Sequence, residues 1–148
     1  MTIKGKTESQ KTVMPFFKAV EKYSKVSPQK IALKVGDSNF TYKELNTLAN
    51  QRAEFFQKQG IHSGDLVGIC SHRDQFLLAS ILGLMKIGAG YVPLDPYFPQ
   101  ARLEYMISHS EIKTLLLSFD LFEKFSHLNL IKLKVDEDLS CHQGIYDE

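Results

Sequence analysis

The sequence has no tryptophan and only two cysteines among its 148 residues. Cys70 and Cys141 lie too far apart in the sequence to have the spacing of a metal-binding pair. Cys70 ends an apolar run, which predicts a buried thiol that packs as a small hydrophobic side chain. We therefore expect a reduced, cytoplasmic protein without a cysteine-based metal site.

Long apolar stretches and an excess of one charge are also missing. The longest apolar run, Phe76–Met85, is shorter than the roughly 20 residues that a membrane-spanning helix needs. The first eleven residues are polar and lysine-rich, unlike a secretory signal. The 18 basic and 17 acidic residues give a net charge of +1, so no strong field attracts nucleic acid or an anionic membrane. We expect neither as a partner.

The chain does have the composition of an ordinary soluble domain, with 43% apolar and 24% charged residues. Its length suits one domain that can bury a hydrophobic core. Polarity along the chain divides it into a polar tail over 1–12, a folded portion over 13–135 and an acidic tail over 136–148.

Apolar periodicity predicts alternating helices and strands. The expected strands cover 31–35, 39–41, 66–70, a stretch beginning at 91, 112–117 and 128–135; the expected helices cover 13–27, 41–59, 74–87, a stretch after Pro99, and 121–125. This alternation predicts an α/β fold, with an open, largely parallel sheet, helices on both faces and right-handed crossovers.

Three of these helices carry specific local signals. Thr41 and Glu44 have the spacing of a capping box, in which each side chain binds the backbone N–H of the other residue. Gly60 is placed to end that helix in a left-handed conformation. Helix 74–87 is apolar on nearly every side, which predicts burial between two layers. Pro99 is suited to the first position of the helix that follows it.

The glycines do not predict a phosphate site. Gly83, Gly88 and Gly90 lie at the end of a helix and before a strand, whereas a phosphate loop follows a strand and precedes a helix. Their amides would therefore face the wrong way. No serine occupies a strand–turn–helix elbow either, so no catalytic triad is predicted.

His72 and Arg73 have the most suggestive surroundings, because they follow the carboxyl end of a strand, where open α/β sheets bind ligands. The favoured interpretation is nevertheless a helix start, capped by Ser71 or Asp74, with both side chains solvated. The remaining candidates are interpreted as structural: surface histidines at His62, His109, His127 and His142, a solvated loop at Asp136, Glu137 and Asp138, and packing tyrosines at Tyr42, Tyr91 and Tyr97.

Two stretches resemble core motifs of the amino-acid adenylation domains of nonribosomal peptide synthetases, within the adenylate-forming superfamily. Phe40–Leu45 is similar to L-T-Y-x-E-L, and Leu84–Pro96 is similar to L-K-A-G-x-A-Y-V-P-L-D-P. Between them, Gly64–Ile69 resembles the family's G-D-x-V-G-I strand. The matching motif residues are Thr41, Tyr42, Glu44, Leu45, Lys86, Gly88, Tyr91, Pro93, Asp95 and Pro96. Both motifs are interpretable as structure rather than as catalysis.

The resemblance implies that a complete family member uses ATP and magnesium to convert a carboxylate into an acyl adenylate, releasing pyrophosphate, and then transfers the acyl group to a phosphopantetheine thiol. The family's phosphate loop, ribose-binding acid, substrate pocket and catalytic lysine have no counterpart before Glu148. We therefore expect an N-terminal piece that is inactive alone and has no catalytic, cofactor-binding or metal-binding residues of its own.

Two alternatives stay open at this point. One alternative is a stand-alone acyl-CoA or aryl-acid ligase of the same superfamily, although the V-P-L-D-P sequence at 92–96 favours the peptide-synthetase branch. The other is a non-catalytic interaction module that exposes apolar surface and binds a partner. The expected partners are the remainder of the adenylation domain, neighbouring synthetase domains, or a second copy of the chain.

Overall fold

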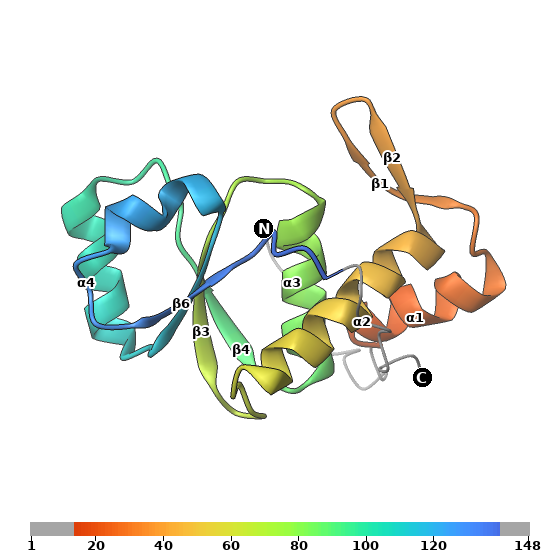
Figure 1. The fold of residues 1–148 in the computed structure, drawn as a ribbon. Coiled ribbons are helices and arrows are strands. Elements are labelled where there is room, and N and C mark those ends of the chain that lie inside the picture. Colours follow the sequence, from red (N-terminus) through yellow and green to blue (C-terminus); the bar gives the residue numbers. More distant parts are fainter. Residues whose placement is uncertain (1–13, 140–148) are drawn as a thin grey trace, which may run out of the picture.

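The computed structural model describes residues 14–139 and contains a parallel sheet between helices (Figure 1). The sheet has four strands in the order β4-β3-β5-β6, and every neighbouring pair is parallel. Their bounds are Leu66–Cys70 for β3, Gly90–Pro93 for β4, Thr114–Leu117 for β5 and Ile131–Lys134 for β6. The prediction of an open parallel α/β sheet is confirmed.

Helices cover both faces of this sheet (Figure 1). On one face, α2 (Tyr42–Lys58) and α3 (Gln75–Lys86) pack against the strands. That layer comprises Ala53, Phe56, Ile61, Val67, Ile69, Leu84, Ile87, Ala89, Leu116 and Val135. On the other face, α4 (Gln100–Ser110) and the 3-10 helix η2 (Phe119–Phe125) bury Leu103, Ile107 and Phe125 against Leu115 and Leu117. Alternate residues of β5 thus face opposite layers, as the pleat of a strand requires.

A third helical layer lies outside α2. The first helix, α1 (Phe16–Val26), contributes Val20 to a buried cluster with Leu45, Ala49 and Leu82. The antiparallel hairpin of β1 (Ile31–Val35) and β2 (Ser38–Thr41) connects α1 to α2 and projects away from the main sheet (Figure 1).

The apolar helix α3 packs against both the sheet and α2, although Leu77, Leu78 and Ile81 on one side of α3 are only half-buried. Its tight contact with α2 depends on Gly83. A Cβ atom at Gly83 would lie 2.9 Å from Arg52 Cβ and 3.0 Å from Ala53 N. Only the absence of a side chain lets the two helices approach this closely, which explains the glycine in the middle of a helix.

Several local predictions are confirmed and some boundaries are corrected. Gly60 has a φ of 92°, as expected of a left-handed helix stop. Pro99 is the N-cap of α4 rather than its first residue, because its ψ of 145° is extended. The short helix expected at 121–125 is a 3-10 helix that already begins at Phe119. The last strand is shorter than expected, and Leu128 and Leu130 pack outside it.

Some predictions concern residues that the structure does not describe. The tail over 1–12 and most of the acidic tail, including Cys141 and His142, lie outside the described range. Within residues 14–139, no helix has the combination of length and apolar character that crossing a membrane demands.

Candidate functional site

The first motif forms the start of α2. Thr41 Oγ1 accepts a hydrogen bond from Glu44 N–H (3.1 Å), and Thr41 N–H donates to Glu44 Oε1 (2.9 Å). The predicted capping box is therefore confirmed. Tyr42 packs beside Tyr23, with ring centroids 5.2 Å apart, and Leu45 is buried. The polar groups of this motif bind one another, so they act in holding the helix start.

The second motif runs from the end of α3 through β4. The side chain of Lys86 forms an ion pair with Glu21 of α1. Gly88 has a φ of 82° and ends the helix in a left-handed conformation. In the turn after β4, Asp95 Oδ1 accepts a hydrogen bond from Tyr97 N–H (2.9 Å). Pro96 O accepts one from Lys124 Nζ (3.0 Å). Each polar group therefore stabilises a turn or a helix contact.

The glycine amides of this motif are already used. Gly88 N–H donates to Met85 O (3.1 Å), and Gly90 N–H donates to Asp65 O (2.8 Å). Gly83 lies within α3. A phosphate group needs several converging free amides, so these glycines do not fit the phosphates of ATP.

A pocket of about 680 Å³ lies at the carboxyl ends of β3 and β4, lined by Ser71, His72, Arg73, Leu77, Pro93, Leu94, Asp95, Pro96, Tyr97 and Phe98. His72 and Arg73 are exposed, as expected, and Asp74 rather than Ser71 caps α3. His72 also has a partner that the sequence pattern did not indicate, because its Nε2 lies 2.9 Å from Asp120 Oδ2 in η2.

Two buried serines, Ser71 and Ser118, join the carboxyl ends of β3 and β5. Ser118 Oγ accepts a hydrogen bond from His72 N–H (3.0 Å) and donates to Ser71 Oγ (3.2 Å). Ser71 Oγ in turn donates to His72 O (2.8 Å). The hydroxyl groups are thus engaged with each other and with the backbone. They hold the ends of β3 and β5 together and are not arranged as a nucleophile with a base.

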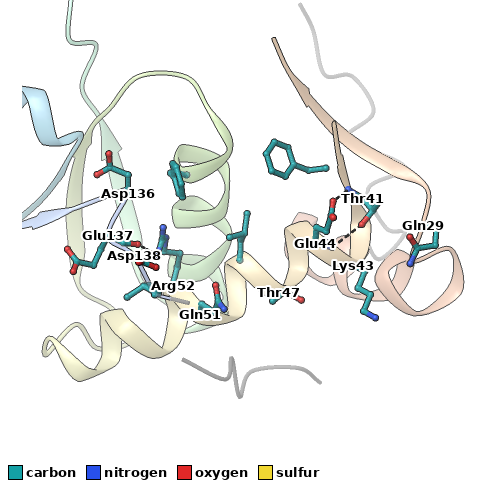
Figure 2. Close-up of a pocket in the computed structure, with 14 residues that line it drawn as sticks. Gln29, Thr41, Lys43, Glu44, Thr47, Gln51, Arg52, Asp136, Glu137 and Asp138 are labelled. Carbon is teal, nitrogen blue, oxygen red and sulfur yellow. Dashed lines mark hydrogen bonds between the residues drawn. The ribbon is translucent and has the colours of Figure 1, made fainter. Parts of the chain in front are cut away.

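A larger pocket, of about 800 Å³, lies between α2 and the segment after β6 (Figure 2). Arg52 of α2 is only 2% exposed, and its Nη1 donates to Glu137 O (2.9 Å). Its guanidinium also lies over the ring of Phe76, 5.2 Å from the centroid. Burial lowers the pKa of Arg52, and the negative charges of Asp136, Glu137 and Asp138 partly oppose that effect.

The acidic triplet of Asp136, Glu137 and Asp138 is therefore more than a solvated loop, because its negative charges lie near the buried guanidinium of Arg52. Asp136 and Asp138 are exposed, in agreement with the prediction. However, Figure 2 shows the triplet gathered beside Arg52. Within residues 14–139, no group of three or more His, Cys, Asp or Glu side chains is positioned to hold a metal ion. Arg52 was missed because it stands inside the helical pattern of α2, where an arginine is ordinarily exposed.

The other candidates divide between confirmed and corrected predictions. Cys70 is fully buried, and this burial raises its pKa to about 11. His127 is on the surface, but it has a partner: its Nε2 lies 2.8 Å from Glu104 Oε2. The interpretation of Tyr97 as a packing residue is wrong, because Tyr97 is 88% exposed. It lies at the tip of the turn that Asp95 stabilises, where no described layer covers it.

Comparison with protein families gives one clear match. The model of the family described as AMP-binding enzyme matches residues 20–147. This range includes both motifs, the four-stranded sheet and the helices that cover it.

Curated relatives include synthetases of peptide antibiotics. Bacitracin synthase 1 of Bacillus licheniformis is 33% identical over 141 residues, which are 93% of this chain and 3% of that protein. Tyrocidine synthase 2 of Brevibacillus parabrevis is 40% identical over 86 residues, which are 58% of this chain and 2% of that protein. The chain thus spans only a few per cent of the length of the curated relatives that it matches.

Solved structures share the fold. A four-domain nonribosomal peptide synthetase bound to AMP and glycine matches with a TM-score of 0.77 and 31% identity, over 84% of this chain and 9% of that chain. The N-terminal subdomain of Klebsiella oxytoca NpsA matches with a TM-score of 0.76 and 24% identity, over 84% of this chain and 32% of that chain. The second likeness supports the fold alone.

Proposed function

Because this chain belongs to the family of AMP-binding enzymes, we propose that it provides the N-terminal scaffold of an amino-acid adenylation domain of a nonribosomal peptide synthetase. Such a domain uses ATP and magnesium to activate an amino acid as an acyl adenylate, with release of pyrophosphate. It then transfers the acyl group to a phosphopantetheine thiol, with release of AMP. The observation that carries the proposal is the family match, which runs through both motifs and the whole sheet.

The contacts of the motif residues support a scaffold role. Thr41 and Glu44 satisfy each other's backbone donors, and Lys86 is paired with Glu21. The amides of Gly88 and Gly90 bind protein carbonyls. The groups that a nucleotide would need are therefore occupied by the fold, so we assign this segment no step in the chemistry.

The chain alone is expected to be inactive. Purified protein, supplied with ATP, magnesium and each amino acid in turn, should give no ATP–pyrophosphate exchange above a control without enzyme. Exchange that survives purification and depends on one amino acid would contradict the scaffold role.

A graft tests whether the segment serves an adenylation domain. Residues 20–139 would replace the aligned segment of the four-domain synthetase that is similar to this chain and binds AMP and glycine. We expect the chimera to retain glycine-dependent exchange, because the scaffold does not select the amino acid. A chimera that folds, as judged by its thermal transition, and yet binds no AMP would contradict the proposal.

The curated relatives favour this function over a stand-alone ligase. The relatives that are 33–40% identical include bacitracin and tyrocidine synthases, whereas an O-succinylbenzoate coenzyme A synthetase shares only the fold, at 18% identity. An interaction module without a role in activation is the rival from another class, and the graft separates the two. We retain a cytoplasmic location as a prediction.

Self-association also stays a prediction. Apolar side chains that the described residues leave exposed include Tyr97, Tyr105, Phe119 and Ile131. Apolar area of this kind favours association by about 25 cal/mol for each Å² that becomes buried. Sedimentation at several micromolar concentrations, with binding of a hydrophobic dye, measures it.

A further inference from the structure

The two edges of the four-stranded sheet differ in their backbone groups. At the β4 edge, Gly90 N–H donates to Asp65 O and Leu94 N–H donates to Ile69 O, so these residues face β3. Successive residues of a strand turn their backbone groups to opposite sides, and Tyr91 and Pro93 therefore face outward. Proline has no N–H. The outer edge of β4 thus offers one donor, that of Tyr91, and a neighbouring strand has little to bind there.

The β6 edge has the opposite character. Ile131 N–H donates to Lys113 O (2.9 Å) and Val135 N–H donates to Leu117 O (2.8 Å), so the odd-numbered residues face β5. Lys132 and Lys134 consequently direct their N–H groups outward, and β6 pairs with no strand other than β5 among the described residues. An edge with two outward donors and no proline is a template for a further strand.

We propose that the sheet continues at β6 and not at β4, and that a strand from the remainder of the adenylation domain pairs with β6 through the backbone of Lys132 and Lys134. The inference rests on the proposed function for the identity of the occupant. The chain corresponds to only 32% of the solved N-terminal subdomain of NpsA. A large part of such a subdomain therefore lies outside the segment that this chain matches.

Charge argues against a second copy as the occupant. Two β6 strands paired about a two-fold axis would bring the lysines of both copies together, and like charges on neighbouring strands are destabilising. Lys132 carries most of this repulsion, because within the described range its Nζ donates only to the backbone oxygens of Leu128 (2.8 Å) and Leu130 (3.3 Å). In contrast, Lys134 Nζ lies 3.4 Å from Glu137 Oε1 and is partly neutralised. Lysines on an edge strand are a recognised obstacle to self-pairing. A strand of different sequence avoids this repulsion.

Hydrogen exchange of the isolated chain is the first test. In the monomer, the amides of Lys132 and Lys134 should exchange rapidly, while those of Ile131 and Val135 should be protected by their bonds to β5. Protection of the two lysine amides in a monomeric sample would contradict the proposal that the β6 edge is open in the isolated chain. Protection that appears only as the chain dimerises would replace the proposed occupant with a second copy.

The second test adds a defined probe, the part of the bacitracin synthase 1 adenylation domain that follows the 141 residues aligned with this chain. The positive control is the aligned segment of bacitracin synthase 1 itself, which should bind the same probe and so show that the probe is folded and able to bind. We expect the probe to protect the amides of Lys132 and Lys134 and to leave that of Tyr91 unchanged. Binding by the control segment but not by this chain, or protection at Tyr91 instead, would overturn the proposal.

Two matched substitutions sharpen the result. Lys132→Pro removes an outward donor from β6, and Tyr91→Pro removes one from β4; neither donor has a backbone partner among the described residues. Both variants should remain folded, and Lys132→Pro should have a slightly lower thermal midpoint, because it also loses the side-chain bonds to Leu128 O and Leu130 O. Lys132→Pro should weaken probe binding about tenfold, the effect of losing one hydrogen bond, and Tyr91→Pro should not. Equal weakening by both would contradict the proposal. These measurements do not depend on catalytic activity. A negative result would therefore contradict the proposed pairing at β6 without contradicting the proposed function.

Discussion

Lys86, in the last turn of α3, forms an ion pair with Glu21 of α1, and the two side chains are only 3% and 10% exposed. The two residues are 65 positions apart in the sequence. The pair therefore joins the second sequence motif to the outermost helix. Because charged groups are costly to bury without a partner, this lysine has a structural role that is independent of any chemistry.

Lys86→Met should lower the free energy of unfolding by at most about 3–5 kcal/mol, the cost of breaking a buried ion pair. Glu21 would keep only Lys18, which is half exposed and lies 3.7 Å away, and this pair offsets part of the loss. The double variant Glu21→Gln with Lys86→Met should recover part of that loss, since it removes both charges. Chemical denaturation of the three proteins checks this. A double variant that is no more stable than Lys86→Met would show that the two charges are not coupled.

Thr41→Ala should lower stability by about 1 kcal/mol, because Glu44 N–H loses the oxygen that caps α2. The matched control is Thr47→Ala, which lies in the same helix with an exposed side chain. That substitution replaces a β-branched residue with a better helix former and should be neutral or slightly stabilising. Equal effects of the two changes on the urea midpoint would mean that the capping bond does not contribute.

Gly83→Ala should destabilise the chain by about 1–3 kcal/mol, the usual cost of overpacking a tight core. The added Cβ would meet the backbone of α2, at 3.0 Å from Ala53 N and 3.1 Å from Ala49 O. Backbone atoms cannot move aside as a side chain can. Gly90→Ala is the control, because its closest contact is the end of the Leu66 side chain at 3.3 Å. Thermal denaturation should show a clearly larger loss for Gly83→Ala.

Cys70 should make stability depend on pH in the alkaline range. Burial raises the pKa of the folded thiol to about 11, from an ordinary value of 9.0. The folded state therefore holds the proton more tightly than the unfolded state does. This contribution is complete below pH 9 and is lost as the pH rises from 9 to 11. Comparison with Cys70→Ala isolates it from other titrating groups, and parallel stability curves for the two proteins over that range would contradict the prediction.

The local sequence pattern was sufficient to predict the type and order of the helices and strands, although not all of their boundaries. The spacing of Thr41 and Glu44 predicted a capping box that the structure contains, and Gly60 ends α2 with a positive φ. The apolar surface of α3 predicted its burial, and α3 packs against the sheet, α2 and α1, although Leu77, Leu78 and Ile81 are only half-buried. These features depend on residues within a few positions of one another, where the geometry of a helix or a turn determines what each side chain reaches.

The tertiary structure alone decided which distant groups meet. Arg52 reaches Glu137 across 85 positions, and His72 reaches Asp120 across 48. No periodicity links such residues, because their approach depends on the strand order β4-β3-β5-β6 and on how α2 packs over it. The same order leaves β4 and β6 at the edges. The sequence by itself determined that Pro93 has no N–H to donate. Only the fold determined that Pro93 faces the outer side of β4, where this N–H would otherwise be available to another strand.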